Sequence, residues 1–114
     1  MSGYASTISE MARLRGVRAA VIAWEREGIP VESASHVDVR TDALTAFACA
    51  LYRRTRQAGA RAGFGETRFL SLEAELGRLF VVGRDDLVLI VLAERDAGAG
   101  QVRMAMQRAA ETLA

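Results

Sequence analysis

The sequence contains no lysine, so all 15 of its cationic side chains are arginine. Without lysine the chain lacks the phosphate-binding residue of a P-loop, Schiff-base chemistry and a lysine general base. Its single cysteine, Cys49, excludes an internal disulfide and suits a reducing compartment. Its single histidine, His36, has no nearby cysteine or carboxylate cluster with which to bind a metal. We therefore predict that the chain is not an enzyme and holds neither cofactor nor metal.

Long apolar runs are also missing. The longest, Leu87 to Ala93 and Val17 to Trp24, fall far short of the roughly 20 residues that a membrane helix needs. No basic segment followed by an apolar stretch opens the chain, as it would in a signal peptide. The net charge of +1 is too balanced for binding through phosphate neutralisation. We expect one cytoplasmic domain over residues 1–114, with no nucleic-acid partner and no membrane insertion.

Helix and strand patterns alternate along the first third of the chain. Thr7 to Glu10 reads as a capping box and predicts that a first helix begins at Thr7. Val17 to Trp24 is apolar on both alternating faces, which predicts a strand in the middle of a sheet. Ile29 to Ser35 contains Pro30, which cannot donate to a ladder and therefore indicates an edge strand. Gly28 is free to adopt the positive φ of the turn between them.

The rest of the chain predicts a long helix, three strands and a last helix. Asp38 is a candidate N-cap for a helix from about Val39 to about Ala58, which Gly59 would end. The later elements are expected at Thr67 to Leu72, Leu76 to Val82, Leu87 to Ala93, and after Gly98 and Gly100. The order α-β-β-α-β-β-β-α, with short connections, predicts an α+β fold with one five-stranded antiparallel sheet. We expect the long helix on one face of this sheet and the two terminal helices on the other.

The long middle helix has two apolar faces. Its spacings of three and four place one stripe toward the sheet: Leu44, Phe47, Ala48, Leu51 and Thr55. The opposite face carries Ala43, Ala46, Ala50, Arg53 and Gln57, with Cys49 at its flank. Small residues let a second helix approach to about 8 Å, so this face predicts a homodimer. The alternative is an alanine-rich helix with high intrinsic propensity and no partner.

The third strand is the second predicted dimer contact. It is expected at the sheet edge opposite Pro30, and an edge without proline invites pairing with another chain. The predicted contact residues are Thr67, Arg68, Phe69 and Leu70. Arg68 and Glu66 could instead protect the edge of a monomer.

The segment Gly16 to Val31, which reads GVRAAVIAWEREGIPV, resembles the first hairpin of the Roadblock (dynein light chain) family. That hairpin typically reads Gly-Val, an apolar run and Asp-Gly-Leu-Pro-Ile, and Glu27 stands where the family often has Asp. The alanine-rich helix after Asp42 and the strand around Leu76 to Leu79 also fit. The resemblance implies a longin-like fold and a homodimer in which middle helices pack together and third strands pair. It also implies a platform for small Ras-like GTPases, as in bacterial GTPase-associated members.

The sequence therefore predicts a noncatalytic, homodimeric scaffold or regulator that binds a small Ras-like GTPase and modulates its GTP hydrolysis. A ligand-sensing module of a related fold is the alternative, and it would need a cavity with a few convergent polar groups. A structural subunit of a larger assembly is a third interpretation.

Overall fold

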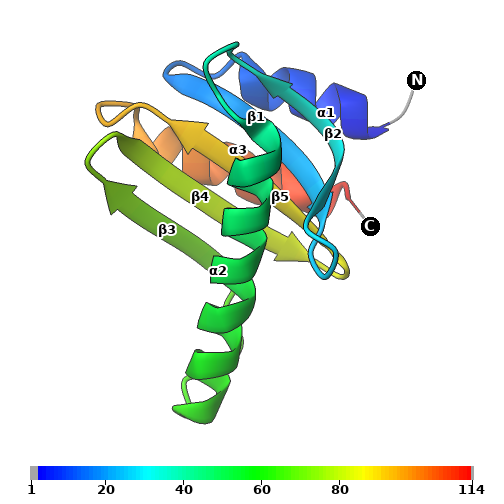
Figure 1. Ribbon diagram of the computed structural model, residues 1–114, viewed down its shortest axis with the longest axis vertical. Coiled ribbons are helices and arrows are strands. Elements are labelled where there is room, and N and C mark those ends of the chain that lie inside the picture. Colours follow the sequence, from blue (N-terminus) through cyan, green and yellow to red (C-terminus); the bar gives the residue numbers. More distant parts are fainter. Residues whose placement is uncertain (1–2, 114) are drawn as a thin grey trace.

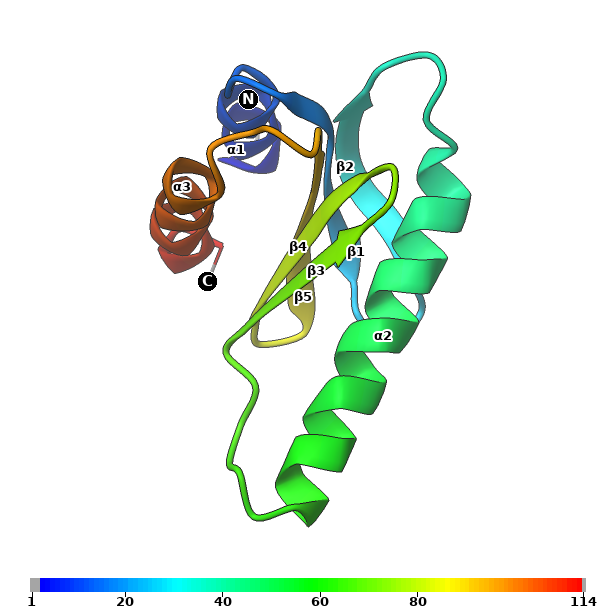
Figure 2. The ribbon, with the colours of Figure 1, turned by 90° about the vertical axis from the view of Figure 1, so that its left-hand side faces the viewer.

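A computed structural model describes residues 3–113 and confirms the predicted order of elements. The elements are α1 (Gly3–Ala12), β1 (Val17–Trp24), β2 (Ile29–Ser35), α2 (Thr41–Arg61), β3 (Phe69–Ala74), β4 (Gly77–Arg84), β5 (Leu87–Ala93) and α3 (Ala99–Glu111). The strands form one five-stranded antiparallel sheet in the order β2-β1-β5-β4-β3. Helix α2 crosses one face of the sheet, and α1 and α3 lie on the other (Figures 1 and 2).

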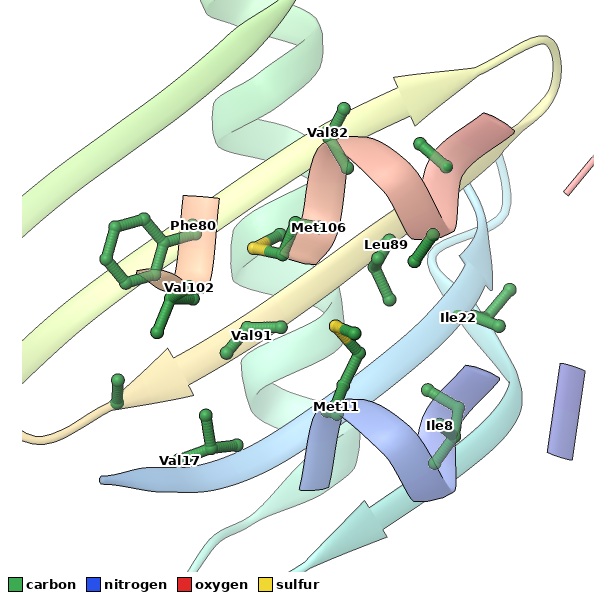
Figure 3. Packing of buried hydrophobic residues seen from close by; sticks show 14 of the residues in the cluster. Ile8, Met11, Val17, Ile22, Phe80, Val82, Leu89, Val91, Val102 and Met106 are labelled. Atoms are coloured by element: carbon green, nitrogen blue, oxygen red, sulfur yellow. The ribbon is translucent and has the colours of Figure 1, made fainter. Parts of the chain in front are cut away.

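Strand β5 lies in the middle of the sheet because its side chains are apolar in both directions. Leu89 and Val91 point toward α1 and α3, whereas Val88 and Ile90 point toward α2. On the α1 and α3 side, methionines from both helices pack over the strands (Figure 3). The sheet is thus covered by an apolar core on each face, as the continuous apolar runs predicted.

The two edges of the sheet differ in chemistry. At one edge, β2 contains Pro30, and the register between β1 and β2 shifts between Ile22 and Ala23, next to the pairing of Ala23 with Pro30. The turn before it contains Gly28 at φ +67°, as predicted. At the other edge, β3 pairs only with β4 within residues 3–113 and contains no proline. The prediction of β3 as the second edge strand is therefore confirmed.

The predicted start of the first helix is wrong. Helix α1 begins at Gly3, and Thr7 is buried inside it instead of capping it. Tyr4 packs against the core one turn before Ile8. This contact extends the helix toward the N-terminus, so the capping-box pattern falls in its interior.

The predicted ends of the long helix are also wrong. Helix α2 begins at Thr41, and Asp38 accepts a bond from Arg18 of β1 at 2.6 Å, so it does not cap the helix. The helix continues through Gly59 to Arg61, and the chain reverses at Gly63, where φ is +74°.

The predicted bounds of three later elements shift by one or two residues. Strand β3 begins at Phe69 rather than Thr67, and β4 covers Gly77–Arg84. In α3, Gly98 is the N-cap while Gly100 lies inside the helix.

Gly83 of β4 leaves room for the Tyr52 ring of α2, so its replacement should destabilise the fold. A Cβ atom at this position would lie 2.5 Å from the Tyr52 hydroxyl oxygen. We expect Gly83→Ala to lower the free energy of unfolding by about 1–3 kcal/mol, because the buried ring must move. Gly100→Ala is the matched control, since a Cβ there meets nothing within 4 Å and alanine favours helix. Urea denaturation of both variants measures the difference.

Candidate interaction surface

Helix α2 faces the sheet with a stripe that matches the predicted one only in part. Its buried residues are Thr45, Ala48, Cys49 and Tyr52. The two hydroxyls are satisfied locally: Thr45 donates to the Thr41 carbonyl at 2.7 Å, and Tyr52 donates to the Thr67 carbonyl at 3.0 Å. Only Ala48 of the predicted sheet-facing stripe is fully buried. The predicted sheet-facing stripe is therefore confirmed in part: Ala48 is buried and Leu44 and Leu51 pack against the core, but Phe47 is exposed and Thr45, Cys49 and Tyr52 are buried instead.

This rotation of α2 leaves its bulkier side chains near the surface. Leu44 and Leu51 are half-buried against the core, and Phe47 is 53% exposed. Together with Leu72 and Leu76, residues of α2 line an apolar groove of about 200 Å³ between α2 and the β3 side of the sheet. Leu76 at the β3–β4 turn is 82% exposed. Exposed apolar side chains gathered around a groove are typical of a protein contact site.

The predicted dimer residues of α2 divide between surface and core. Ala43, Ala46 and Gln57 are exposed, and Ala50 and Arg53 are half-buried. The exposed ones share the open side of the helix with Phe47. Their small side chains leave room for a second helix.

Cys49 lies in the core instead of on this open side, with 1% of its surface exposed. It packs with Ala48 and Tyr52 against the sheet, and we remove it from the predicted interface. Burial raises the pKa of its thiol, although the nearby charge of Arg53 acts in the opposite direction. The thiol therefore stays protonated and shielded at neutral pH.

We expect Cys49 to resist alkylation in the folded protein, because both its burial and its raised pKa suppress the reactive thiolate. Iodoacetamide labelling followed by mass spectrometry should give little adduct at pH 7.5 and complete reaction in denaturant. Mild oxidation should produce no disulfide-linked dimer. Rapid labelling of Cys49 in the folded protein would contradict its burial and show that the thiol is accessible at the surface.

The predicted residues of the third strand also point in several directions. Thr67 and Arg68 come before β3 rather than within it. The Phe69 ring is half-buried on the α3 side, 6.2 Å from the Phe80 ring and 4.9 Å from the Arg103 guanidinium carbon. Leu70 packs toward α2. The contact that β3 can offer to another chain is therefore its backbone edge, together with the side chains on the α2 side.

The C-terminal half of α2 extends beyond the sheet (Figures 1 and 2). It is held there by an ion pair between Arg56 and Glu25, whose side chain is only 7% exposed. Tyr52 lies beside this pair, with Arg56 over its ring at 5.7 Å. The pKa of the Tyr52 hydroxyl is raised, mainly by burial and in part by the negative charge of Glu66. A hydrogen bond with the Gly83 backbone opposes this shift but does not cancel it. These contacts fix the direction in which the helix projects.

Residues 3–113 contain no group of three His, Cys, Asp or Glu side chains arranged to hold a metal ion. Within the same residues, no helix is both long and apolar enough to cross a membrane.

The fold is that of a small α+β domain in which one face of α2 and the edge of β3 are uncovered in the single chain. Residues 4–93 match the Roadblock/LC7 domain. The chain therefore belongs to the Roadblock/LC7 family, and the resemblance seen in its sequence is confirmed.

Solved structures share this fold over nearly the whole chain. A Roadblock/LC7 domain from Streptomyces avermitilis is 25% identical, with a TM-score of 0.87 over 98% of this chain and 95% of that one. MglB from Myxococcus xanthus has a TM-score of 0.86 at 14% identity, over 97% of this chain and 91% of that one. By sequence, the chain is also similar to an uncharacterized protein of Methanocaldococcus jannaschii, which is 24% identical over 91% of this chain and 90% of its own length.

Proposed function

We propose that this chain is a noncatalytic, homodimeric scaffold that binds a small Ras-like GTPase in the cytoplasm and regulates its GTP hydrolysis. The observation that carries the proposal is the coincidence of two open features, the apolar face of α2 and the unpaired edge of β3. Both border one groove on one side of the molecule. A surface of this kind binds protein rather than a small substrate.

Self-association accounts for both open features together. A two-fold axis beside β3 pairs the two β3 edges and brings the two α2 helices together on the same face of a continuous sheet. The proposed interface comprises Ala43, Ala46, Ala50, Arg53 and Gln57, the region Thr67 to Leu70 and, in addition, Phe47 and Leu76. Phe47 and Leu76 are the most exposed apolar side chains around the groove, and burying them supplies the apolar centre of the interface.

The GTPase partner is supported by family membership and by the bacterial proteins that share the fold. The Roadblock resemblance implies a platform for small Ras-like GTPases. The similar structures include MglB of Myxococcus xanthus and a gliding protein of Thermus thermophilus. In a dimer, the two projecting ends of α2 add exposed arginine side chains, among them Arg54 and Arg61, to a composite surface. Such a surface suits an acidic patch on a partner.

The decisive experiment uses a small Ras-like GTPase from the same organism as this chain, loaded with GDP or with a nonhydrolysable GTP analogue. We expect gel filtration to show a complex with one nucleotide state, and GTP turnover to change when the chain is added. Failure to form a complex under either load would contradict the GTPase proposal. A large thermal stabilisation by one metabolite would instead favour the ligand-sensing alternative.

A further inference from the structure

An exposed phenylalanine follows the C-terminal end of α2, where this helix extends beyond the sheet (Figures 1 and 2). Phe64 is 89% exposed, more than any other aromatic side chain in residues 3–113. Its backbone N–H donates to the Gly59 carbonyl at 2.9 Å, and the N–H of Gly63 donates to the Ala60 carbonyl at 3.1 Å. With Gly63 at φ +74°, these two bonds form a Schellman motif. The loop that carries the ring is therefore tied to the helix end.

A Schellman motif usually gives the side chain at this position an apolar partner in the last turns of the helix. Here the two partner positions are Gly59, which has no side chain, and Ala58, which is itself exposed. The returning chain occupies the space over Gly59, because a Cβ atom there would lie 3.7 Å from the Gly65 carbonyl oxygen and 3.8 Å from Thr67 Oγ1. The helix end therefore offers the Phe64 ring no apolar surface to cover.

Positive charge is concentrated at the same end of the molecule. Residues 53–68, which we call the α2 tip, contain five arginines and one glutamate, for a net charge of +4, whereas the whole chain carries +1. The rest of the chain therefore carries −3. Arg56 is paired with Glu25, but Arg54 and Arg61 are exposed and form no ion pair within residues 3–113. These two arginines lie two turns apart on one side of the helix.

We propose that the α2 tip docks on a lipid bilayer that carries anionic headgroups. The Phe64 ring enters the headgroup region, and Arg54 and Arg61 lie against the negative headgroups. An aromatic ring at headgroup level and cations beside anionic lipids are the two contributions that hold a segment at a bilayer surface. This contact differs from the membrane helix that the sequence excludes, because only one ring leaves the water.

The shape and charge of the tip favour a bilayer over a protein as the occupant. The neighbours of Phe64 are small, with Ala62 and Gly63 before it and Gly65 after it, so the ring stands alone on a projecting end. A protein interface buries a patch many side chains wide, which a single ring does not supply. Lipid headgroups, in contrast, close around a projection of any shape. The net negative charge of the remaining chain also directs the α2 tip toward an anionic surface.

This proposal shares Arg54 and Arg61 with the partner surface proposed above, but Phe64 belongs to it alone. It does not rest on the GTPase function or on the α2–β3 dimer. Binding to vesicles is therefore measured without any GTPase, and Phe64 is the residue that separates the two proposals.

Cosedimentation of the full chain with vesicles of phosphatidylcholine, alone or with about 30% phosphatidylserine, tests the proposal. We expect wild type to bind the anionic vesicles only, and raised ionic strength to weaken that binding. Phe64→Ser should lower the partition coefficient at least about fivefold, because the apolar contribution is lost. Arg54→Gln combined with Arg61→Gln should lower it at least about tenfold.

Two matched controls lie away from the α2 tip. Val37→Ser removes another fully exposed apolar side chain, in the loop between β2 and α2, and should leave vesicle binding unchanged. Arg15→Gln combined with Arg95→Gln removes the same charge from exposed positions outside the tip and should cost much less than the tip pair. Phe64→Trp should bind at least as tightly as wild type, and its fluorescence should shift to the blue on anionic vesicles. Wild type, whose one tryptophan is Trp24, should show no such shift.

Three results would overturn the proposal. In the first, wild type binds neither kind of vesicle. In the second, Phe64→Ser binds as wild type does, or Phe64→Trp shows no blue shift. In the third, Phe64→Ser lowers the mass measured by sedimentation equilibrium or abolishes the complex with a GTPase while vesicle binding stays the same, which would assign the ring to a protein contact. Loss of the GTPase complex in wild type would contradict the proposed function and leave the vesicle result standing.

Discussion

Replacing Phe47 with arginine should convert the proposed α2–β3 dimer into a folded monomer. Phe47 is 53% exposed in the single chain and lines the apolar groove between α2 and the β3 side, so dimerisation would bury it at the centre of the contact. An arginine there must lose its hydration without gaining a carboxylate partner. Aromatic residues at the centre of an interface contribute a large share of the binding energy. We therefore expect the dissociation constant of the dimer to rise at least about a hundredfold. Sedimentation equilibrium measures the change.

The matched control for this substitution is Ile29→Arg. Ile29 is 57% exposed, which is close to the value for Phe47, but it lies on β2 at the opposite edge of the sheet. It should leave the α2–β3 dimer intact, whereas Ala46→Arg and Ala50→Arg should disrupt that dimer as Phe47→Arg does. Circular dichroism should show all four variants folded. If Phe47→Arg and Ile29→Arg change the molecular mass measured by sedimentation equilibrium to the same extent, the proposed interface is wrong.

Removing the Arg56 side chain should destabilise the fold more than removing any other cation that forms an ion pair in residues 3–113. Its partner Glu25 is only 7% exposed, so Arg56→Ala leaves a carboxylate nearly buried without its counter-charge. Breaking such a pair from one side costs about 3 kcal/mol, because the desolvated charge is no longer compensated. The C-terminal half of α2 should also lose its anchor to the β1–β2 turn. Chemical denaturation measures the first effect, and hydrogen exchange of residues 53–61 measures the second.

Two further variants show whether the unpaired charge is the cause. Adding Glu25→Gln to Arg56→Ala removes the charge and should recover most of the lost stability. Arg18→Ala breaks a more exposed pair, since the side chain of its partner Asp38 is 66% exposed, and should cost less than about 1 kcal/mol. If Arg18→Ala and Arg56→Ala lower the free energy of unfolding equally, the burial of Glu25 does not make its ion pair more important for stability.

Strands were the part of the fold most readable from the sequence. The ranges of β1, β2 and β5 match the predicted ones to the residue. A strand buried on both faces leaves an uninterrupted apolar run, and turn residues such as Gly28 bound it. Helix ends were less predictable, because their partners come from elsewhere in the chain. Asp38 is an example: its pairing with Arg18 of β1 is invisible to any local pattern.

The rotation of α2 could not be predicted from hydrophobicity. The predicted stripe contains both Phe47 and Ala48, and its large side chains make it more apolar than the set of Thr45, Ala48, Cys49 and Tyr52 that the structure buries. In the buried set, the Tyr52 hydroxyl donates to the Thr67 carbonyl, a partner beyond the end of the helix that no pattern within the helix reveals. One clue was present in the sequence: Thr45, Ala48 and Tyr52 also recur at helical spacing. That signal alone does not outweigh three large apolar side chains.

The sequence by itself determined the order of elements, the antiparallel sheet with Pro30 at one edge, and the absence of lysine chemistry. Periodicity and backbone chemistry are local properties, so they can be read without knowing what a segment touches. Only the tertiary structure decided which side of α2 meets the sheet, and that Cys49 is core and Phe47 surface. Those outcomes depend on residues far apart in the chain, whose packing and hydrogen bonds compete for the same helix face.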